Sequence, residues 1–177
     1  MDLTSKNLLK KILGYLVQFD IVIFDLDNTL LNINLQQLAF LNLQDIYNRS
    51  KKDDFTKYVN NYNFIRILLI NLQRLGKTVI ILTHSERNIV RAFIESVNLQ
   101  FYFDYIISAR IRGRLIKKSL FITDINNEWT IKYNRLPYII FFDDNLNNFK
   151  DMTTNVRCIH VPEGLTKDIF EELTQMY

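Results

Sequence analysis

The chain alternates short apolar runs with segments whose apolar residues recur at helical spacing. Short apolar runs that end in polar residues are typical of buried strands, whereas apolar stripes repeating every three or four positions are typical of amphipathic helices. Alternation of the two predicts an α/β fold with a central parallel sheet and helices on both faces. The predicted strands are 20–25, 78–82, 102–107, 138–142 and 156–161, and the predicted helices are 4–18, 35–48, 63–75, 86–97, one starting near Asn145, and 166–177.

The stretch ahead of the 138–142 strand fits neither pattern. Residues 119–133 alternate loosely between apolar and polar positions around the pair Asn126-Asn127, which favours a turn. We therefore predict a short β-hairpin here, with strands 120–125 and 128–133. A hairpin at this position would deliver Lys132 towards the functional end of the sheet.

Acidic and hydroxyl side chains follow three of the predicted strands where each strand ends. Ligands of open α/β sheets bind outside the carboxyl ends of parallel strands, so side chains from separate strands can converge there. Like charges at the mouth of an apolar run repel each other, which favours a cation or a reacting group between them. The first strand leads into Asp25, Asp27 and Thr29, the second into Thr83, His84 and Ser85, and the fourth into Asp143, Asp144 and Asn145.

The composition of this set points to a hard cation. Four carboxylates and a hydroxyl, without a cysteine or histidine cluster, favour Mg²⁺ over zinc, because Mg²⁺ takes a few carboxylates and leaves positions for water and phosphate. Phosphate chemistry is therefore the leading hypothesis. The alternative for the first motif alone is a polar turn in which Asp27 caps a helix.

Length and composition indicate one domain. The 177 residues are 48% hydrophobic, with four Gly and two Pro and a net charge of +3. These values favour one compact unit, 1–177, made of an N-terminal amphipathic helix (1–18), a catalytic core (19–161) and a C-terminal helix (165–177). The apolar runs are too short to span a membrane, and the N-terminus lacks an export signal. With the single Cys158, these features predict a soluble intracellular protein of the cytoplasm or nucleus.

The order of these motifs resembles that of the haloacid dehalogenase-like phosphatases. In this chain the order is Asp25-Leu26-Asp27-Asn28-Thr29, then Thr83, which closes an apolar strand, then a lysine, and then Asp143-Asp144. The segment 130–136 and the ending Asp143-Asp144-Asn145 are similar to those of phosphatases that act on the RNA polymerase C-terminal domain. The resemblance implies a Rossmann-like fold, and the interval from Asp25 to Thr83 implies a small cap or none. Heavy use of Ile, Asn and Lys is typical of an AT-rich coding source such as a virus or a parasite. For a viral source, the motifs resemble those of the nucleocapsid-assembly phosphatases of large insect DNA viruses.

The phosphate-binding lysine of this pattern has three candidates. Lys132 lies in the segment that resembles the lysine motif. Its interval to Asp143 is tight for the helix that usually intervenes, so Lys117 and Lys118 remain alternatives.

The resemblance also implies roles for individual residues. Asp25 is the expected nucleophile, Asp27 the general acid and base, and Lys132 and Thr83 the ligands of the phosphoryl oxygens. Mg²⁺ would be held by Asp25, the backbone carbonyl of Asp27 and one or both carboxylates at the end of the fourth strand. The expected further contacts to substrate are Thr29, His84, Ser85 and Asn145.

The substrate is the least determined part. The resemblance implies phosphoserine or phosphothreonine in an extended protein segment, and a basic cluster close to the site in sequence suits a phosphorylated peptide or nucleic acid. A nucleic-acid-end phosphatase, a small-metabolite phosphatase and a catalytically idle binding module are the alternatives. Oligomeric state stays open. The basic cluster consists of Arg110, Arg112, Arg114, Lys117 and Lys118.

Overall fold

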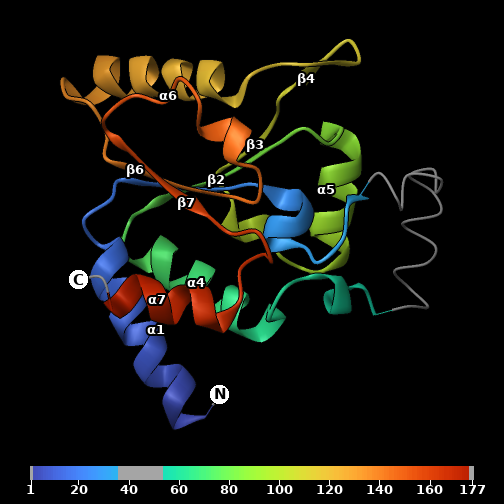
Figure 1. Cartoon of the computed structure of the whole chain (residues 1–177), viewed down its shortest axis with the longest axis vertical. Coiled ribbons are helices and arrows are strands. Elements are labelled where there is room, and N and C mark those ends of the chain that lie inside the picture. Colours follow the sequence, from blue (N-terminus) through green and yellow to red (C-terminus); the bar gives the residue numbers. More distant parts are fainter. Residues whose placement is uncertain (1, 36–53, 176–177) are drawn as a thin grey trace.

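The computed structural model describes residues 2–35 and 54–175, and most of the helix predicted at 35–48 lies outside them. Its centre is a five-stranded, fully parallel sheet with the strand order β3-β2-β1-β6-β7 (Figure 1). This confirms the predicted α/β class and all five predicted strands, which shift by at most a few residues. The strands are β1 (Ile21–Phe24), β2 (Thr78–Thr83), β3 (Tyr105–Ser108), β6 (Ile139–Asp143) and β7 (Val156–His160).

Helices cover both faces of the sheet. Figure 1 shows α6 on one face, with α1, α4 and α7 on the other. The apolar side chains of α5 pack with those of α1, α4 and α7 in one core cluster, whereas Ile122 of α6 packs in a second cluster on the opposite face. The helices are α1 (Leu3–Leu16), α4 (Tyr62–Arg74), α5 (Arg87–Ser96), α6 (Lys118–Tyr133) and α7 (Lys167–Gln175).

The central strand β1 is apolar at every position because both of its faces are covered. Val22 and Phe24 point into the larger core cluster, and Ile21 and Ile23 into the smaller one. All four side chains are at most 1% exposed. This is the continuous apolar pattern expected of a strand buried in a parallel sheet.

The strand order creates a switch point beside β1. From β1 the chain proceeds to β2 and β3 on one side, and it later returns to β6 and β7 on the other side. Crossovers that leave in opposite directions open a crevice at the carboxyl ends of the strands between them. The switch point lies where β1 and β6 end, next to Asp25 and Asp143.

The hairpin predicted within residues 119–133 is wrong, because this stretch forms α6. The side chains that α6 buries include three polar ones, Lys118, Ser119 and Asn126, so the helical stripe carries little hydrophobic signal. Asn126 does not form a turn. Its Nδ2 donates to Thr153 and its Oδ1 accepts from Asn155, so tertiary hydrogen bonds hold it inside the helix.

A smaller hairpin does precede α6. It pairs β4 (Arg110–Ile111) with β5 (Arg114–Leu115) through a two-residue turn. The helix predicted near Asn145 is a single 3₁₀ turn, η4 (Leu146–Phe149). Among the described residues, no helix combines the length and the apolar character needed to cross a bilayer.

Candidate active site

A tight turn after β1 places the first acidic motif. Asp25 follows the last residue of β1, and its backbone N–H donates to the carbonyl of Phe142 on β6 at 2.8 Å. The next residues form a wide turn, η1 (Leu26–Leu30), in which Asp27 and Asn28 depart from helical geometry and Asn28 takes a left-handed φ of 56°. The turn carries Thr29 back over the strand end, where its Oγ1 lies 3.4 Å from Asp25 Oδ2.

Lys118 is the cation of the site. It is the first residue of α6, and its Nζ donates to Asp25 Oδ1 at 2.6 Å and to Asp143 Oδ2 at 2.7 Å. The Lys118 side chain is 1% exposed, and those of Asp25 and Asp143 are 7% and 0% exposed. Charges this deeply buried are stable only when they are paired and hydrogen-bonded, so the lysine joins the ends of β1 and β6.

Asp143 is held from two further directions. Asn148 Nδ2 donates to Asp143 Oδ1 at 2.8 Å and to Oδ2 at 2.9 Å, and the backbone N–H of Asn145 donates to Oδ1 at 2.9 Å. The carboxylate therefore has a fixed orientation. The exposed Asn145 side chain accepts instead from the N–H of Asn147, so its predicted contact to substrate stays a prediction.

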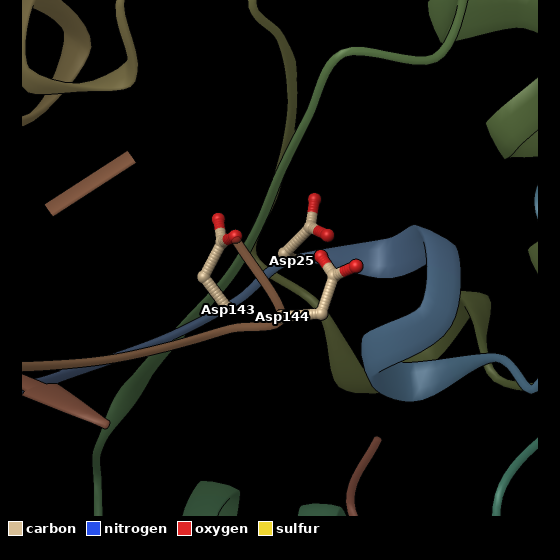
Figure 2. Close-up of side chains that lie close together, drawn as sticks. All are labelled: Asp25, Asp143 and Asp144. Carbon is tan, nitrogen blue, oxygen red and sulfur yellow. The ribbon is translucent and has the colours of Figure 1, made fainter. Parts of the chain in front are cut away.

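Three carboxylates converge at this point. Asp25, Asp143 and Asp144 each present an oxygen, and these oxygens all lie within 4.8 Å of one another (Figure 2). Asp144 comes from the residue after β6, and Asn28 Nδ2 lies 3.4 Å from its Oδ2. Three carboxylates against one ammonium leave an excess of negative charge in an all-oxygen cluster, of which Asp25 and Asp143 are buried and Asp144 is half-buried. This donor set fits Mg²⁺.

Burial and the charge of Asp143 disfavour the ionised forms of Asp25 and Asp144. Burial, followed by the charge of Asp143, raises the pKa of Asp25 to about 7 against the pull of Lys118. Burial also raises the pKa of Asp144, with the neighbouring Asp143 as the second cause. A divalent cation at the cluster would favour the charged carboxylates and reverse both shifts.

Asp27 lies beside this cluster with partners of its own. Its Oδ2 accepts from Ser85 Oγ at 2.6 Å and from Thr83 Oγ1 at 3.3 Å, and its Oδ1 accepts from the backbone N–H of Leu35. Thr83 and Ser85 are buried, whereas Asp27 is half-buried. Thr83 and Ser85, which end and follow β2, therefore contact the motif that follows β1. The contact is made by Asp27 and not by Asp25.

The structure does not bring Lys132 to the site. Lys132 is exposed on the last turn of α6, with its Nζ over the ring of Tyr133. It lines a pocket with Ile21 and Thr78, which begin their strands, so it lies at the opposite end of the sheet from Asp25. The expected delivery of this lysine fails because the hairpin that would have carried it is a helix. Lys117 is also outside the site, paired at the surface with Asp151 at 2.8 Å.

The His84 side chain contacts the segment that precedes α6. Its ring Nε2 lies 3.0 Å from the carbonyl of Ile116, and its own carbonyl accepts from Arg110 Nε at 3.1 Å. The residue thus ties the loop after β2 to the hairpin β4–β5. Its contact with substrate and that of Thr29, which is fully buried, stay predictions.

Two residues of the site were not anticipated. Asn148 fixes Asp143 from η4, and Asn28 contacts Asp144 from the left-handed position in η1. Asn is enriched at left-handed positions, which is a signal for Asn28. Nothing in the sequence distinguishes Asn148 from its neighbours Asn145 and Asn147. Lys118 had a usable signal, because its interval to Asp143 accommodates a helix.

Two solved structures share the fold. The HAD domain of the effector protein Lem4 from Legionella pneumophila is 17% identical, with a TM-score of 0.60 over 89% of this chain and 93% of that domain. A HAD-superfamily hydrolase from Ehrlichia chaffeensis is 20% identical, with a TM-score of 0.52 over 90% of this chain and 98% of the other. At these identities the likeness establishes the haloacid dehalogenase fold alone.

Sequence comparison identifies the family. No curated protein matches the chain. A family model described as acid phosphatase matches residues 18–177, which include every member of the acidic cluster and Lys118. The narrower resemblance to polymerase-tail phosphatases and the viral origin are not confirmed. The match over nearly the whole sequence shows that the chain belongs to the acid phosphatase family, and its fold is that of the haloacid dehalogenases.

Proposed function

We propose that this protein is a Mg²⁺-dependent phosphatase that works through an aspartyl-phosphate on Asp25 and acts on phosphoserine or phosphothreonine in a protein segment. One observation carries the chemistry. A buried aspartate at the switch point is oriented by a buried lysine and faces two further carboxylates from the neighbouring strand. Membership of the acid phosphatase family supports the reaction class.

The first step transfers the phosphoryl group to the enzyme. A carboxylate oxygen of Asp25 forms a bond to phosphorus while the bond from phosphorus to the ester oxygen breaks. The departing oxygen takes a proton from Asp27, so serine or threonine leaves as a neutral alcohol. The hydroxyls of Ser85 and Thr83 donate to Asp27 Oδ2 and so fix the orientation of the carboxyl group that gives up the proton.

The second step restores the enzyme. Asp27, now a carboxylate, removes a proton from a water molecule as that water attacks the phosphorus of the acyl phosphate. The bond from phosphorus to Asp25 breaks, inorganic phosphate leaves, and the Asp25 carboxylate and the protonated Asp27 are regenerated. Splitting hydrolysis into two displacements lets one positioned acid serve both steps.

Charge neutralisation is the main demand on the site. A phosphate dianion must approach three carboxylates, and the transition state spreads its charge over the equatorial oxygens. We assign this task to Lys118 in place of Lys132, with the hydroxyl of Thr83 at the edge of the site. Asp25, Asp143, Asp144 and the backbone carbonyl of Asp27 would hold Mg²⁺, which supplies positive charge for the phosphoryl oxygens when bound.

The experiment measures phosphate release from p-nitrophenyl phosphate and from phosphoserine peptides, with and without Mg²⁺, for the wild type and Asp25→Asn. We expect metal-dependent turnover that Asp25→Asn abolishes, and a higher kcat/KM for the peptides. Turnover that survives in a folded Asp25→Asn variant would overturn the aspartyl-phosphate mechanism. No turnover in the folded, Mg²⁺-bound wild type would favour a binding module.

A further inference from the structure

An unpaired sheet edge runs towards the proposed site. β3 ends the strand order, and within residues 2–35 and 54–175 it pairs only with β2. A groove of about 540 Å³ follows this edge and is lined by all four residues of β3, with Phe121 of α6 on one side and Glu86 and Arg87 on the other. We call it the β3 groove. An open strand edge presents backbone N–H and C=O groups that an extended chain can pair with.

Hydrogen bonds join the β3 groove to the catalytic loop. Ser108, at the end of β3, donates through Oγ to the carbonyl of Ser85 at 2.7 Å, and Ser85 Oγ donates to Asp27. Arg110, which also lines the groove, donates to the carbonyl of His84. A segment lying along β3 would therefore reach the loop that holds the proposed general acid.

The β3 groove carries positive charge that no ion pair among the described residues neutralises. Arg87, Arg110 and Arg112 line it against a single acid, Glu86. Among the ion pairs of the described residues, none includes any of these arginines. Two arginines also occupy positions that local structure disfavours.

Arg87 is the first residue of α5, where the helix dipole disfavours a cation. Arg112 takes a φ of +49° in the turn of the hairpin β4–β5, where Asn, Asp or Gly is preferred. Unfavourable local choices of this kind cluster at functional sites. Both residues therefore support a ligand-binding role for the groove.

We infer that the β3 groove binds an acidic, extended segment of the protein substrate as an additional strand beside β3, which positions the phosphorylated residue at Asp25. The inference rests on the proposed function, because it names how the protein substrate is held. Main-chain pairing with β3 supplies affinity for an extended chain, and the arginines select acidic side chains or further phosphates. The four residues of β3 span about 13 Å, which matches roughly four substrate residues.

Charge decides against a second copy of this chain as the occupant. A two-fold contact through β3 would bring two copies of the same positively charged groove, each with Arg87, Arg110 and Arg112, into one interface. Like charges juxtaposed in an interface disfavour association. An anionic peptide complements the groove.

The first test measures peptide affinity without turnover. In the Asp25→Asn background, with Mg²⁺ present, fluorescence anisotropy reports the Kd of a labelled phosphoserine peptide with acidic flanks. We expect Arg87→Glu and Arg112→Asn each to raise the Kd about fivefold, as loss of an exposed ion pair implies. Arg66→Glu and Arg66→Asn, on the exposed side of α4, apply the same charge changes elsewhere and should leave the Kd unchanged.

A loss of folding would not explain the raised Kd of these variants. Arg87→Glu removes a cation from a helix N-terminus, and Arg112→Asn creates the Asn-Gly pair favoured in such a turn, so both variants should have an equal or higher Tm. Equal affinity for the two groove variants and the Arg66 controls would overturn the proposal. So would equal affinity for peptides with acidic and with neutral flanks.

A second test addresses strand pairing directly. Hydrogen exchange of the amides of residues 105–108 is followed on addition of the peptide, and we expect slower exchange there. Alternate backbone amides of the bound peptide point towards β3. Peptides N-methylated at these amides should lose the protection, and peptides N-methylated at the amides between them should keep it. Unchanged exchange, or stronger protection by a 5′-phosphorylated oligonucleotide, would overturn the proposal. Turnover of p-nitrophenyl phosphate tests the chemistry independently, so failure of docking is distinguishable from failure of catalysis.

Discussion

Replacement of Lys118 by methionine tests the assignment of the phosphate-binding lysine. Methionine preserves much of the apolar stem but removes the ammonium that contacts Asp25 at 2.6 Å and Asp143 at 2.7 Å. Loss of one preorganised charge-stabilising donor costs about 3 kcal/mol in the barrier, which corresponds to a fall of about 150-fold in kcat/KM. The assay is p-nitrophenyl phosphate hydrolysis at saturating Mg²⁺.

The matched control is Lys132→Met, in the last turn of the same helix. Lys132 is exposed and lies at the other end of the sheet, so this variant should retain wild-type kcat/KM. The comparison is decisive because sequence resemblance favoured Lys132, whereas the geometry favours Lys118. A folded Lys118→Met enzyme within threefold of the wild type, or an equal loss in Lys132→Met, would refute the assignment.

The same substitution should affect stability. Removal of one partner from a buried ion pair costs about 3–5 kcal/mol, because the remaining charge is buried without compensation. In Lys118→Met the Asp25 and Asp143 carboxylates lose their shared cation, so we expect a lower urea midpoint in EDTA. Mg²⁺ should recover part of the loss by supplying positive charge at the same cluster. A midpoint that does not respond to Mg²⁺ in either protein would count against metal binding at this cluster.

Three further predictions concern the surroundings of the site. Because the pKa of Asp25 is raised to about 7, the metal-free folded chain keeps a proton that the unfolded chain loses near pH 4. Its stability should therefore fall as pH rises from 5 to 8, and the Tm of Asp25→Asn in EDTA should fall less. Gly164→Ala should lower the free energy of unfolding by about 2 kcal/mol, because φ is +77° and the added Cβ would clash with Asn60 Nδ2. An unchanged denaturation midpoint would contradict this. Asp20→Asn should lower the free energy of unfolding by about 1 kcal/mol at pH 7. Asp20 accepts two hydrogen bonds of 2.7 Å from Arg135 and one from the N–H of Tyr138. The difference from the wild type, measured by urea denaturation, should shrink below pH 4, because the lowered pKa of Asp20 is passed there.

The sheet and the acidic strand ends were predictable because their signals are local. A strand buried on both faces must be apolar throughout, and in β1 that run ends directly at Asp25. The parallel arrangement then places Asp25 and Asp143 together without any knowledge of side-chain contacts. The convergence of Asp25, Asp143 and Asp144 follows from these two facts.

The position of the lysine was not predictable in the same way. Its helix, α6, buries Lys118, Ser119 and Asn126 along with Ile122, and a stripe with three polar members does not register as an apolar face. The partners that make these polar residues acceptable come from β1, β6 and the segment 153–155, all distant in sequence. Long-range hydrogen bonds stabilise the helix in this segment, whereas the local sequence pattern favoured a β-hairpin.

The exceptions to local rules gather at one end of the sheet. Lys118 and Arg87 are cations at the first residues of helices, where anions are preferred, and Arg112 takes a left-handed conformation. The first of these is offset inside the protein, because Lys118 is paired with two carboxylates. Neither Arg87 nor Arg112 has an ion pair among the described residues. If function maintains such exceptions, the compensation for Arg87 and Arg112 must come from a bound molecule, and an anionic substrate segment on the β3 groove supplies it.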